Sequence, residues 1–403
     1  MNIKTDPPSK VTKIYNQLGP NERAIVDKVK PLFLRNLFIL LINGKLQLQF
    51  SGWLQYLVPL PLTLLVLVVA GIAYLLGAVQ LATYIAYVGG GLLFIIAFDI
   101  VTTKFHLRPP EPLPKRKDEM TIFDLMRTRR SCRSYQIRKL TPSDHAELMA
   151  SVKLHSEEKL LGVSPVRFEY ISAPLTVWPV VNGSEFLVAI APAKYDRLAV
   201  MDVGRSLQKI VIDATRMGLS TCWIGPGADH KSVVHHLGNR FDKQTDSIIC
   251  VCAVGYRSWL IPLFIRIFSY LVRSRLTLRS LIFADSELKN PAQLDIEPIK
   301  KFAQAFEACQ WSPSSYNGQT TRLVSILDDQ GRVDRFDFYA VTASRYYAAV
   351  AVGIWCANWE MGCEALSLRG HFKVLTESER GLQNIQDQPQ IPRYDVSWVS
   401  DEK

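Results

Sequence analysis

Arg129-Arg-Ser-Cys-Arg133 comes directly after a short amphipathic segment, 121–127, which predicts a helix. Arg129 and Arg133 are four residues apart, so an ordered turn can aim both guanidinium groups at one phosphate through charge-assisted hydrogen bonds. Ser131 adds a neutral donor between them. The alternative is a solvated basic helix end, which describes most charge clusters. Judged alone, this stretch slightly favours the solvated helix end, so the rest of the chain must decide.

A second basic loop, Arg273-Ser-Arg275, follows the apolar segment 258–272. Two loops of this kind could converge on one phosphate, although positive charge beside a membrane surface would look the same in sequence. The apolar segment is too short, and too interrupted by Arg266, to span a bilayer. It therefore predicts an interfacial helix, with a buried core helix as the alternative.

Two further motifs carry polar or flexible residues at the ends of predicted elements. Gly218-Leu-Ser-Thr-Cys-Trp-Ile-Gly225 places a strand after a helix and ends in a glycine, where a flat ligand could approach the backbone. Ser312-Pro-Ser-Ser-Tyr-Asn-Gly-Gln319 gathers hydroxyl and amide groups that suit the edge of a heterocycle. The alternative for the second motif is an ordinary polar turn.

The N-terminal quarter indicates a membrane segment. The 53 residues from Leu46 to Phe98 contain no Lys, Arg, Asp, Glu or His, whereas one span needs only ~20 apolar residues. We therefore predict two spans, at about 57–77 and 81–101, joined by a tight turn. Lys and Arg flank the hairpin on both sides, so both termini and the soluble region are expected in the cytoplasm.

Net charge and cysteine content restrict the function classes. The chain carries a net charge of +10, and residues 1–118 supply +7 of it, from 13 Lys and Arg against 6 Asp and Glu. Because this charge flanks the predicted hairpin, a nucleic-acid interface is not expected. Seven scattered cysteines argue against a disulfide framework, and Cys250 and Cys252 should be buried on one sheet face. No ligand spacing for a metal is present around the histidines.

The remaining chain reads as a mixed α+β region with an internal duplication. Both parts follow the order helix, strand, strand, long helix, Met-Gly, with long helices predicted at 202–217 and 344–361. Short helices are expected at 141–154 and 296–309, and strands at 167–172, 185–191, 221–224, 247–254, 322–327 and 335–339. The predicted regions are a basic N-terminus (1–50), the hairpin (51–104), a Pro- and Lys-rich linker (105–118), a first half (119–290), a second half (291–375) and a polar surface tail (376–403).

Taken together, the four motifs resemble those of the nitroreductase family of FMN-dependent flavoenzymes. The similarity covers residues 119–375, but the order of the motifs differs. In the family the Pro-Ser-x-x-Asn loop follows the phosphate loop closely, whereas here the corresponding stretch, Leu160–Arg167, lacks the Asn. The chain is therefore similar to the tandem, pseudo-dimeric branch, in which two diverged halves share one flavin and no obligate homodimer is needed.

The resemblance implies which residues bind the cofactor. The expected phosphate contacts are Arg129, Ser131, Arg133, Arg273 and Arg275, the expected ring contacts on the first half are Trp223, Ile224 and Gly225, and those on the second half are Ser314, Ser315, Asn317 and Gln319.

The implied activity is a membrane-anchored, ping-pong hydride transfer from NAD(P)H through the flavin to a nitroaromatic, a quinone or a similar lipophilic acceptor. No catalytic side chain is expected, because the cofactor carries the chemistry. The alternative is a degenerate flavin-fold protein that acts as a membrane-associated binding module. The altered first-half loop and the long 258–272 insertion favour that alternative, and the complementary motifs favour catalysis.

Overall fold

A computed structural model describes residues 11, 14, 15, 26, 27, 29, 31–48, 53–56, 59–175, 183–225, 230–271, 274–381 and 391–401. The chain forms two compact units. The first consists of Met1–Leu107, Thr176–Asn182 and Pro262–Ile265, and the second of Arg108–Leu175, Gly183–Ile261 and Arg266–Lys403. Each unit is described by itself.

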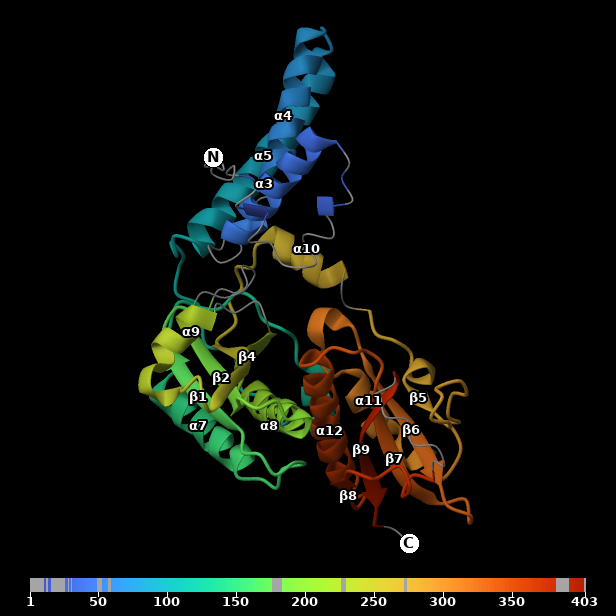
Figure 1. The fold of residues 1–403 in the computed structure, drawn as a ribbon. Helices are drawn as coiled ribbons and strands as arrows, with labels where there is room; N and C mark the ends of the chain where they lie inside the picture. The colour runs from blue at the N-terminus through green and yellow to red at the C-terminus, as the bar shows by residue number, and fades with distance from the viewer. Residues whose placement is uncertain are drawn as a thin grey trace, which may run out of the picture. The chain divides into compact units, whose positions relative to one another are not determined.

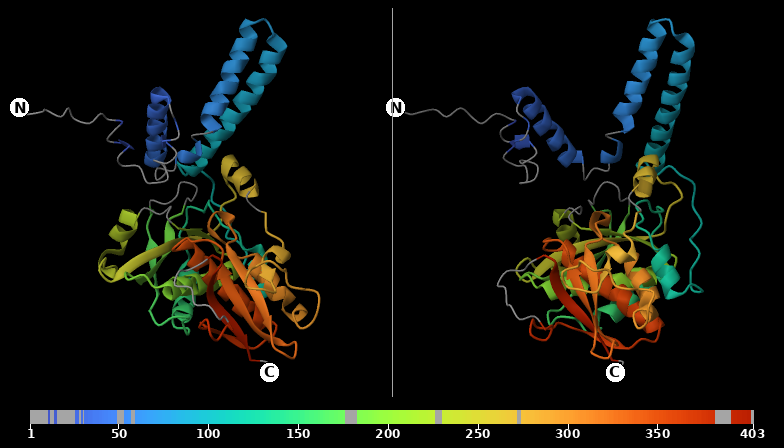
Figure 2. Two further views of the ribbon diagram at one scale, coloured as in Figure 1. Left: turned by 45° about the vertical axis from the view of Figure 1, so that its right-hand side comes forward. Right: turned by 90° about the vertical axis from the view of Figure 1, so that its right-hand side faces the viewer.

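The first unit contains a helical hairpin. Helices α4 (Pro59–Leu75) and α5 (Val79–Thr103) pack side by side in antiparallel directions (Figure 2). The turn between them uses Gly77 at a φ of +81°, a conformation that glycine adopts without strain. Helix α5 is long and apolar enough to cross a membrane, whereas α4 is a shorter apolar helix of 17 residues. Helix α3 (Leu32–Leu48) and a short turn (Leu54–Tyr56) precede the hairpin, and neither element was predicted.

The first sheet of the second unit has four strands, all antiparallel, in the order β1-β2-β4-β3. Every strand predicted for this half is confirmed to within one residue at each end. Cys250 and Cys252 are both buried in the same core cluster, as predicted. The strands are β1 (Arg167–Ser172), β2 (Glu185–Pro192), β3 (Ser220–Ile224) and β4 (Asp246–Gly255), and the helices are α6 (Ile122–Thr128), α7 (Pro142–Ser156), α8 (Arg197–Arg216) and α9 (His230–Leu237).

The second sheet has five strands in the order β5-β6-β7-β9-β8, and only the β5/β6 pair is parallel. Its aromatic core centres on Trp359, which stacks on Phe302 at 5.6 Å between ring centroids. The strands are β5 (Ile282–Phe283), β6 (Thr321–Leu327), β7 (Val333–Ala340), β8 (Gly370–Lys373) and β9 (Arg393–Ser400), and the helices are α11 (Ala303–Gln310) and α12 (Tyr347–Ala365). Helix α10 (Leu263–Leu271) begins in the Pro262–Ile265 segment of the first unit and continues into the second.

The prediction of a polar surface tail from residue 376 is wrong for β9. This strand lies between β7 and β8, and its side chains Val396 and Trp398 are buried against the aromatic core. The alternating apolar residues of the strand carried a period-two signal, which the polar residues before it obscured.

The two Met-Gly sequences do not have the same structural role. Gly218 follows the end of α8 with a φ of +84°, as expected of a glycine that ends a helix. Gly362, in contrast, lies inside α12, which continues to Ala365. The prediction that Gly362 ends the second long helix is therefore wrong. Glycine at this position allows close packing of α12 on α11 instead, because a Cβ there would lie 3.3 Å from Ala305.

Helices α8 and α12 pack along each other between the two sheets (Figure 1). Their contact is reciprocal: a Cβ on Gly204 would lie 2.3 Å from the Val350 carbonyl oxygen, and a Cβ on Gly353 would lie 1.9 Å from the Met201 carbonyl oxygen. Each glycine therefore lies against the backbone of the other helix, at the residue three positions before that helix's own glycine. Such mutual contacts are typical of two-fold related elements. The strand orders β1-β2-β4-β3 and β6-β7-β9-β8 correspond in the same way.

A network of charges joins α7 and α8 to α12. Arg205 forms a bidentate ion pair with Glu360, at 3.0 and 2.6 Å. Lys209 bonds both Glu360, at 2.8 Å, and Glu158. His155 continues the network, because its two ring nitrogens lie 2.6 Å from Glu158 and 2.8 Å from Asp213.

His155 should make the stability of this unit depend on pH. Burial would lower the pKa of His155, but its bonds to Asp213 and Glu158 outweigh this effect and raise the pKa to about 9. Its stabilising contribution is therefore complete below the unfolded pKa of about 6.5 and is lost as pH rises through about 9. We expect His155→Asn to cost on the order of 1–3 kcal/mol at pH 6 and little at pH 9.5, as measured by denaturant unfolding. A cost that does not change with pH would contradict this prediction.

Candidate flavin site

The Arg129-to-Tyr135 loop lies along the edge of the first sheet. Helix α6 begins at the cap Thr121, whose hydroxyl accepts a hydrogen bond from the Asp124 amide, and the chain leaves the helix at Arg129. The Cys132 amide then donates to the Thr221 carbonyl of β3, at 2.8 Å. Tyr135 forms an isolated antiparallel bridge with Arg257, which follows β4. Strands β3 and β4 thereby hold both ends of the loop.

Arg129 is a buried cation without a partner in the part of the chain that the structure describes. Its side chain is only 5% exposed, and neither Nε nor Nη1 has a hydrogen-bond partner. Burial, together with the nearby charges of Arg275 and Arg130, lowers the pKa of Arg129 to about 10. An unpaired buried charge is costly, so this arrangement is suited to an anion that enters the site.

Arg275 lies in the same cluster of cations. Its guanidinium group donates to the carbonyl of Ser312, at 2.9 Å, and lies over the ring of Trp311, 5.7 Å from the centroid. Arg130 lies over the same ring at 4.9 Å. Burial, together with the charge of Arg130, lowers the pKa of Arg275 to about 10. Arg129, Arg130 and Arg275 form the group that we call the arginine cluster.

The other predicted phosphate contacts differ in their surroundings. Arg133 is half-buried, and its Nη1 donates to the hydroxyl of Ser269 on α10, at 3.2 Å. Burial raises the pKa of the Cys222 thiol, and the charges of Arg133 and Arg129 both oppose this rise, so Arg133 and Arg129 lie near the same thiol. Ser131 is exposed and pairs through its main chain with Thr221. Arg273 lies outside the described residues.

The Pro313-to-Gln319 loop holds the segment that carries Arg275. Asn317 Nδ2 donates to the Ser274 carbonyl at 2.8 Å, and the Leu276 amide donates to Gln319 Oε1 at 2.8 Å. The Gln319 amide in turn donates to Ser314 Oγ, at 2.9 Å. The side chains of Asn317 and Gln319 thus bind the backbone on either side of Arg275. Ser315 begins a short helical turn, Ser315–Asn317.

Three residues of this loop adopt the left-handed conformation without being glycine: Tyr316, Asn317 and Gln319, with φ of 51°, 55° and 47°. Each such residue is unfavourable, and several together are typical of functional loops whose shape the surrounding structure imposes.

The end of β3 meets the beginning of α12. A Cβ on Gly225 would lie 2.7 Å from Cε1 of Tyr347, so only glycine fits there. The hydroxyl of Tyr347 and Nε1 of Trp223 are both buried, and neither has a partner among the described residues. Burial, helped by nearby Tyr316, raises the pKa of Tyr347 to about 12. Ile224 is buried, so its backbone is the part available to a ligand.

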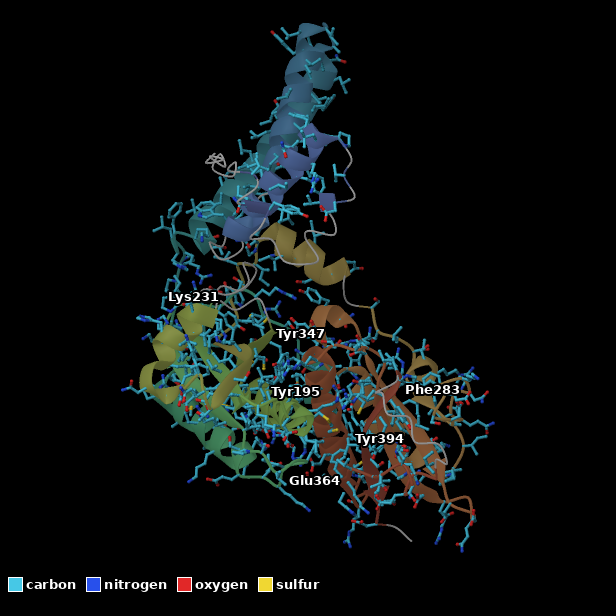
Figure 3. The ribbon with its side chains drawn as sticks, viewed as in Figure 1. Tyr195, Lys231, Phe283, Tyr347, Glu364 and Tyr394 are labelled. Atoms are coloured by element: carbon cyan, nitrogen blue, oxygen red, sulfur yellow. The ribbon has the colours of Figure 1, made fainter. Side chains whose placement is uncertain are left out.

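The structure therefore brings most of the predicted residues into one region. One end is cationic (Arg129, Arg133, Arg275), and the other carries unpaired polar groups beside a glycine (Trp223, Gly225). Sequence reasoning missed Tyr347, which lies at the start of α12 (Figure 3), as well as Trp311. Tyr347 belongs to an aromatic stretch with helical spacing, which predicts core residues rather than a site. Its role follows only from its contact with Gly225.

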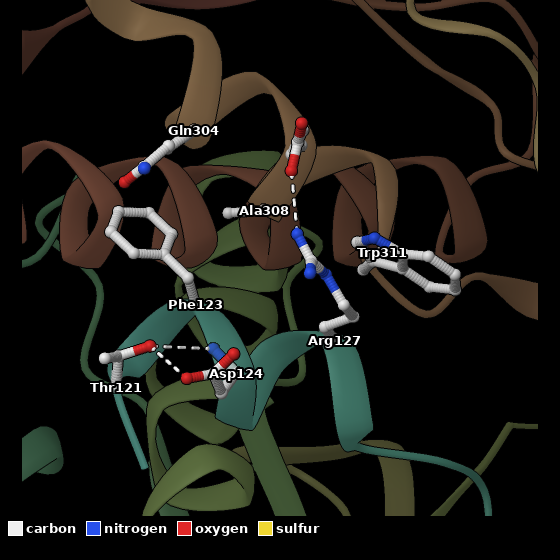
Figure 4. Close-up of a pocket in the computed structure, with 8 residues that line it drawn as sticks. Thr121, Phe123, Asp124, Arg127, Gln304, Ala308 and Trp311 are labelled. Carbon is white, nitrogen blue, oxygen red and sulfur yellow. Dashed lines mark hydrogen bonds and ion pairs between the residues drawn. The ribbon is translucent and has the colours of Figure 1, made fainter.

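A separate pocket lies between α6 and α11 (Figure 4). It has a volume of about 340 Å³. Arg127 in its wall is paired with Glu307 at 2.9 Å, so this cation is already neutralised. Trp311, over whose ring Arg130 and Arg275 lie, also lines this pocket. The other lining residues are Thr121, Phe123, Asp124, Gln304 and Ala308.

Comparison with known proteins establishes the family. A family model described as "Putative TM nitroreductase" matches residues 121–362, which is more than half of the chain. The chain therefore belongs to this nitroreductase family, as its motifs predicted. No curated protein sequence matches it significantly.

Solved structures of nitroreductases are also similar to the chain. The "putative nitroreductase" of Thermotoga maritima MSB8 is 13% identical, with a TM-score of 0.42, covering 73% of this chain and 98% of its own. The FMN-bound nitroreductase of Bacteroides fragilis NCTC 9343 is 15% identical (TM-score 0.28; 34% and 89% covered). The "putative nitroreductase" of Exiguobacterium sibiricum 255-15, in complex with FMN, is 14% identical (TM-score 0.30; 36% and 92% covered). The family assignment depends on the family model, since these TM-scores are low.

Proposed function

We propose that this protein is a membrane-anchored, FMN-dependent NAD(P)H oxidoreductase. The observation that carries the proposal is the buried guanidinium group of Arg129 beside Arg275, whose Nε and Nη1 have no partner among the described residues, in a chain of the nitroreductase family. A phosphate would supply the negative charge that this cluster lacks. FMN is the cofactor that relatives of known structure contain.

The residues present fit such a cofactor. Arg129 and Arg275 would bind the phosphate, and Arg133 would add a donor from the same loop. The backbone from Trp223 to Gly225 would face the ring, with the Tyr347 hydroxyl as a polar contact. Asn317 and Gln319 would act mainly by holding the backbone around Arg275, as their hydrogen bonds support.

When bound, FMN supplies the transfer of two electrons from NAD(P)H to an acceptor. The tasks left to the protein are therefore binding, orientation and charge. No acid or nucleophile from a side chain is required, and cationic or amide donors near the ring would stabilise negative charge that develops there.

The site would be shared between two diverged halves of one chain. The matching strand orders and the reciprocal glycine contacts of α8 and α12 support a pseudo-dimer. The phosphate loop and Gly225 belong to one half, and Tyr347 and the Pro313-to-Gln319 loop belong to the other. A second copy of the chain would then not be needed to complete the site.

The hairpin of α4 and α5 would anchor the protein through two spans. At 1.5 Å per residue α4 is about 26 Å long and α5 about 37 Å, against a hydrocarbon core of about 30 Å. Basic residues on both sides of the hairpin support cytoplasmic termini. A membrane location favours a lipophilic acceptor such as a quinone or a nitroaromatic compound.

The visible absorption spectrum of the purified protein tests this function. In detergent, the protein should contain or take up FMN, and NADPH or NADH should bleach the oxidised flavin band. Bleaching that is reversed by a quinone would support turnover. If no flavin were bound even with excess FMN, the enzyme hypothesis would fail, and the alternative of a non-catalytic membrane-associated binding module would replace it.

The shared site makes a second prediction, for Asn317→Ala. Loss of the bond from Asn317 Nδ2 to the Ser274 carbonyl should loosen the segment that carries Arg275 and lower FMN affinity about fivefold. Titration of apoprotein with FMN, followed by flavin fluorescence, measures this change. Asn239→Ala, at an exposed position, is the control. Unchanged affinity in Asn317→Ala would argue against a contribution from the second half.

A further inference from the structure

The apolar segment before Arg275 is bound to the phosphate loop at its beginning. The Ser258 amide donates to the Ser134 carbonyl at 3.0 Å, and Ser134 Oγ donates to the Leu260 carbonyl at 2.8 Å. The buried carboxylate of Glu111 adds two more bonds, from the Ser258 hydroxyl at 2.9 Å and from the Trp259 amide at 2.6 Å.

The same segment contacts the loop again near the end of α10. Ser269 accepts a hydrogen bond from Arg133, and Arg275 of the arginine cluster follows six residues later. In a helix, successive residues are about 100° apart, so Ile267 and Tyr270 share one face and Ser269 points well away from its centre. Ile267 is 51% exposed and Tyr270 is 70% exposed. The helix thus presents an apolar face to solvent while its Ser269 contacts Arg133.

Arg108 limits how far this segment can be from a membrane. Its guanidinium group donates to the Tyr135 carbonyl at 2.6 Å and to the Ser258 hydroxyl at 2.9 Å. Only four residues, 104–107, separate Arg108 from the end of α5 at Thr103, and the five residue-to-residue steps between these two positions cover at most about 18 Å in an extended chain. If α5 spans a bilayer, the membrane surface is therefore the first large apolar partner within reach of Trp259, which is 69% exposed.

We propose that the exposed face of α10 docks on a lipid bilayer and that this docking holds Ser269 against Arg133, which tightens the flavin site. The proposal rests on the proposed function, because it assigns a partner to the same site. The bilayer would hold one face of α10 while the bond from Arg133 holds Ser269 on another. The positions of Arg133 and Arg275 are then set before the cofactor binds. Flavin retention then depends on the membrane.

The test uses the full-length protein in nanodiscs of phosphatidylcholine with about 30% phosphatidylglycerol. Brominated lipids quench nearby tryptophans, and the difference between wild type and Trp259→Phe isolates the signal of Trp259. We expect quenching in wild type, loss of most of it in the double variant Ile267→Ser/Tyr270→Ser, and retention in Ser269→Ala. This measurement needs no bound flavin.

FMN dissociation from the same nanodiscs tests the coupling. We expect dissociation to be about tenfold faster in both the double variant and Ser269→Ala, since each removes the ordering of Arg133. Val163→Ser, at a position that is 98% exposed, is the control and should match wild type. Unchanged dissociation in the double variant, or absence of Trp259 quenching in wild type, would overturn the proposal. Failure of every form to bind FMN would instead overturn the proposed function, whatever the lipid quenching shows.

Discussion

Arg129→Met should lower FMN affinity at least a hundredfold and at the same time stabilise the apoprotein. Its Nε and Nη1 have no partner among the described residues, so each can form a charge-assisted bond worth about 1.5–3 kcal/mol to a phosphate, and a methionine offers none. Without the ligand, however, the charge is buried and repelled by Arg275 and Arg130. Replacing it by an apolar side chain of similar length should raise the free energy of unfolding by about 1–3 kcal/mol.

A fall in FMN affinity together with a rise in the stability of the flavin-free protein distinguishes a binding residue from a structural one. FMN titration gives the affinity, and denaturant unfolding of the flavin-free protein gives the stability. Arg127→Met is the matched control, since Arg127 is an exposed arginine whose ion pair with Glu307 contributes about 0–1 kcal/mol. An Arg129→Met protein that lost stability and kept its flavin would contradict an anion site at this position.

Gly353→Ala should be among the most destabilising single substitutions in the second unit. The added methyl group would lie 1.9 Å from the Met201 carbonyl oxygen, and backbone cannot yield as a flexible side chain can. The helices α8 and α12 would have to separate, which we expect to cost about 3 kcal/mol or more. Because the proposed site draws residues from both sides of this contact, flavin affinity should fall as well.

Gly362→Ala provides a graded comparison within the same helix. Its added methyl group would meet Ala305 at 3.3 Å, a contact that a small shift relieves, and alanine favours the helix by up to about 1 kcal/mol. We expect its unfolding free energy to remain within about 1 kcal/mol of wild type. Equal losses in Gly353→Ala and Gly362→Ala would mean that the close approach of the two backbones is not what requires glycine at 353.

Local sequence patterns predicted most of the secondary structure. The apolar stretches predicted as strands became β1, β2, β3, β4, β6 and β7. Strand β2 is buried along almost its whole length, so its signal was a continuous apolar run rather than an alternation. Strand β9 was missed although Val396 and Trp398 alternate, since the polar stretch before it resembles a surface tail. Helix α3 was also missed. The helix end at Gly362 was misplaced because a glycine used for packing and a glycine that ends a helix look alike in sequence.

The phosphate motif Arg129-to-Arg133 was recognisable because its residue types suit only a few kinds of ligand. What the sequence could not provide was the environment of each arginine. Arg129 is buried without a partner in the described part of the chain, whereas Arg130, one residue later, lies over Trp311. Burial and pairing depend on elements that come from α11 and from the segment after α10, more than 140 residues away.

By itself, the sequence determined the family, an N-terminal apolar segment and the candidate residues, because residue type and periodicity are local properties. Only the tertiary structure decided that Arg275 reaches Arg129, that Asn317 holds the backbone beside Arg275, and that Tyr347 meets Gly225. These contacts join segments far apart in the chain, and their energies come from burial and charge that arise only when the two sheets pack around α8 and α12.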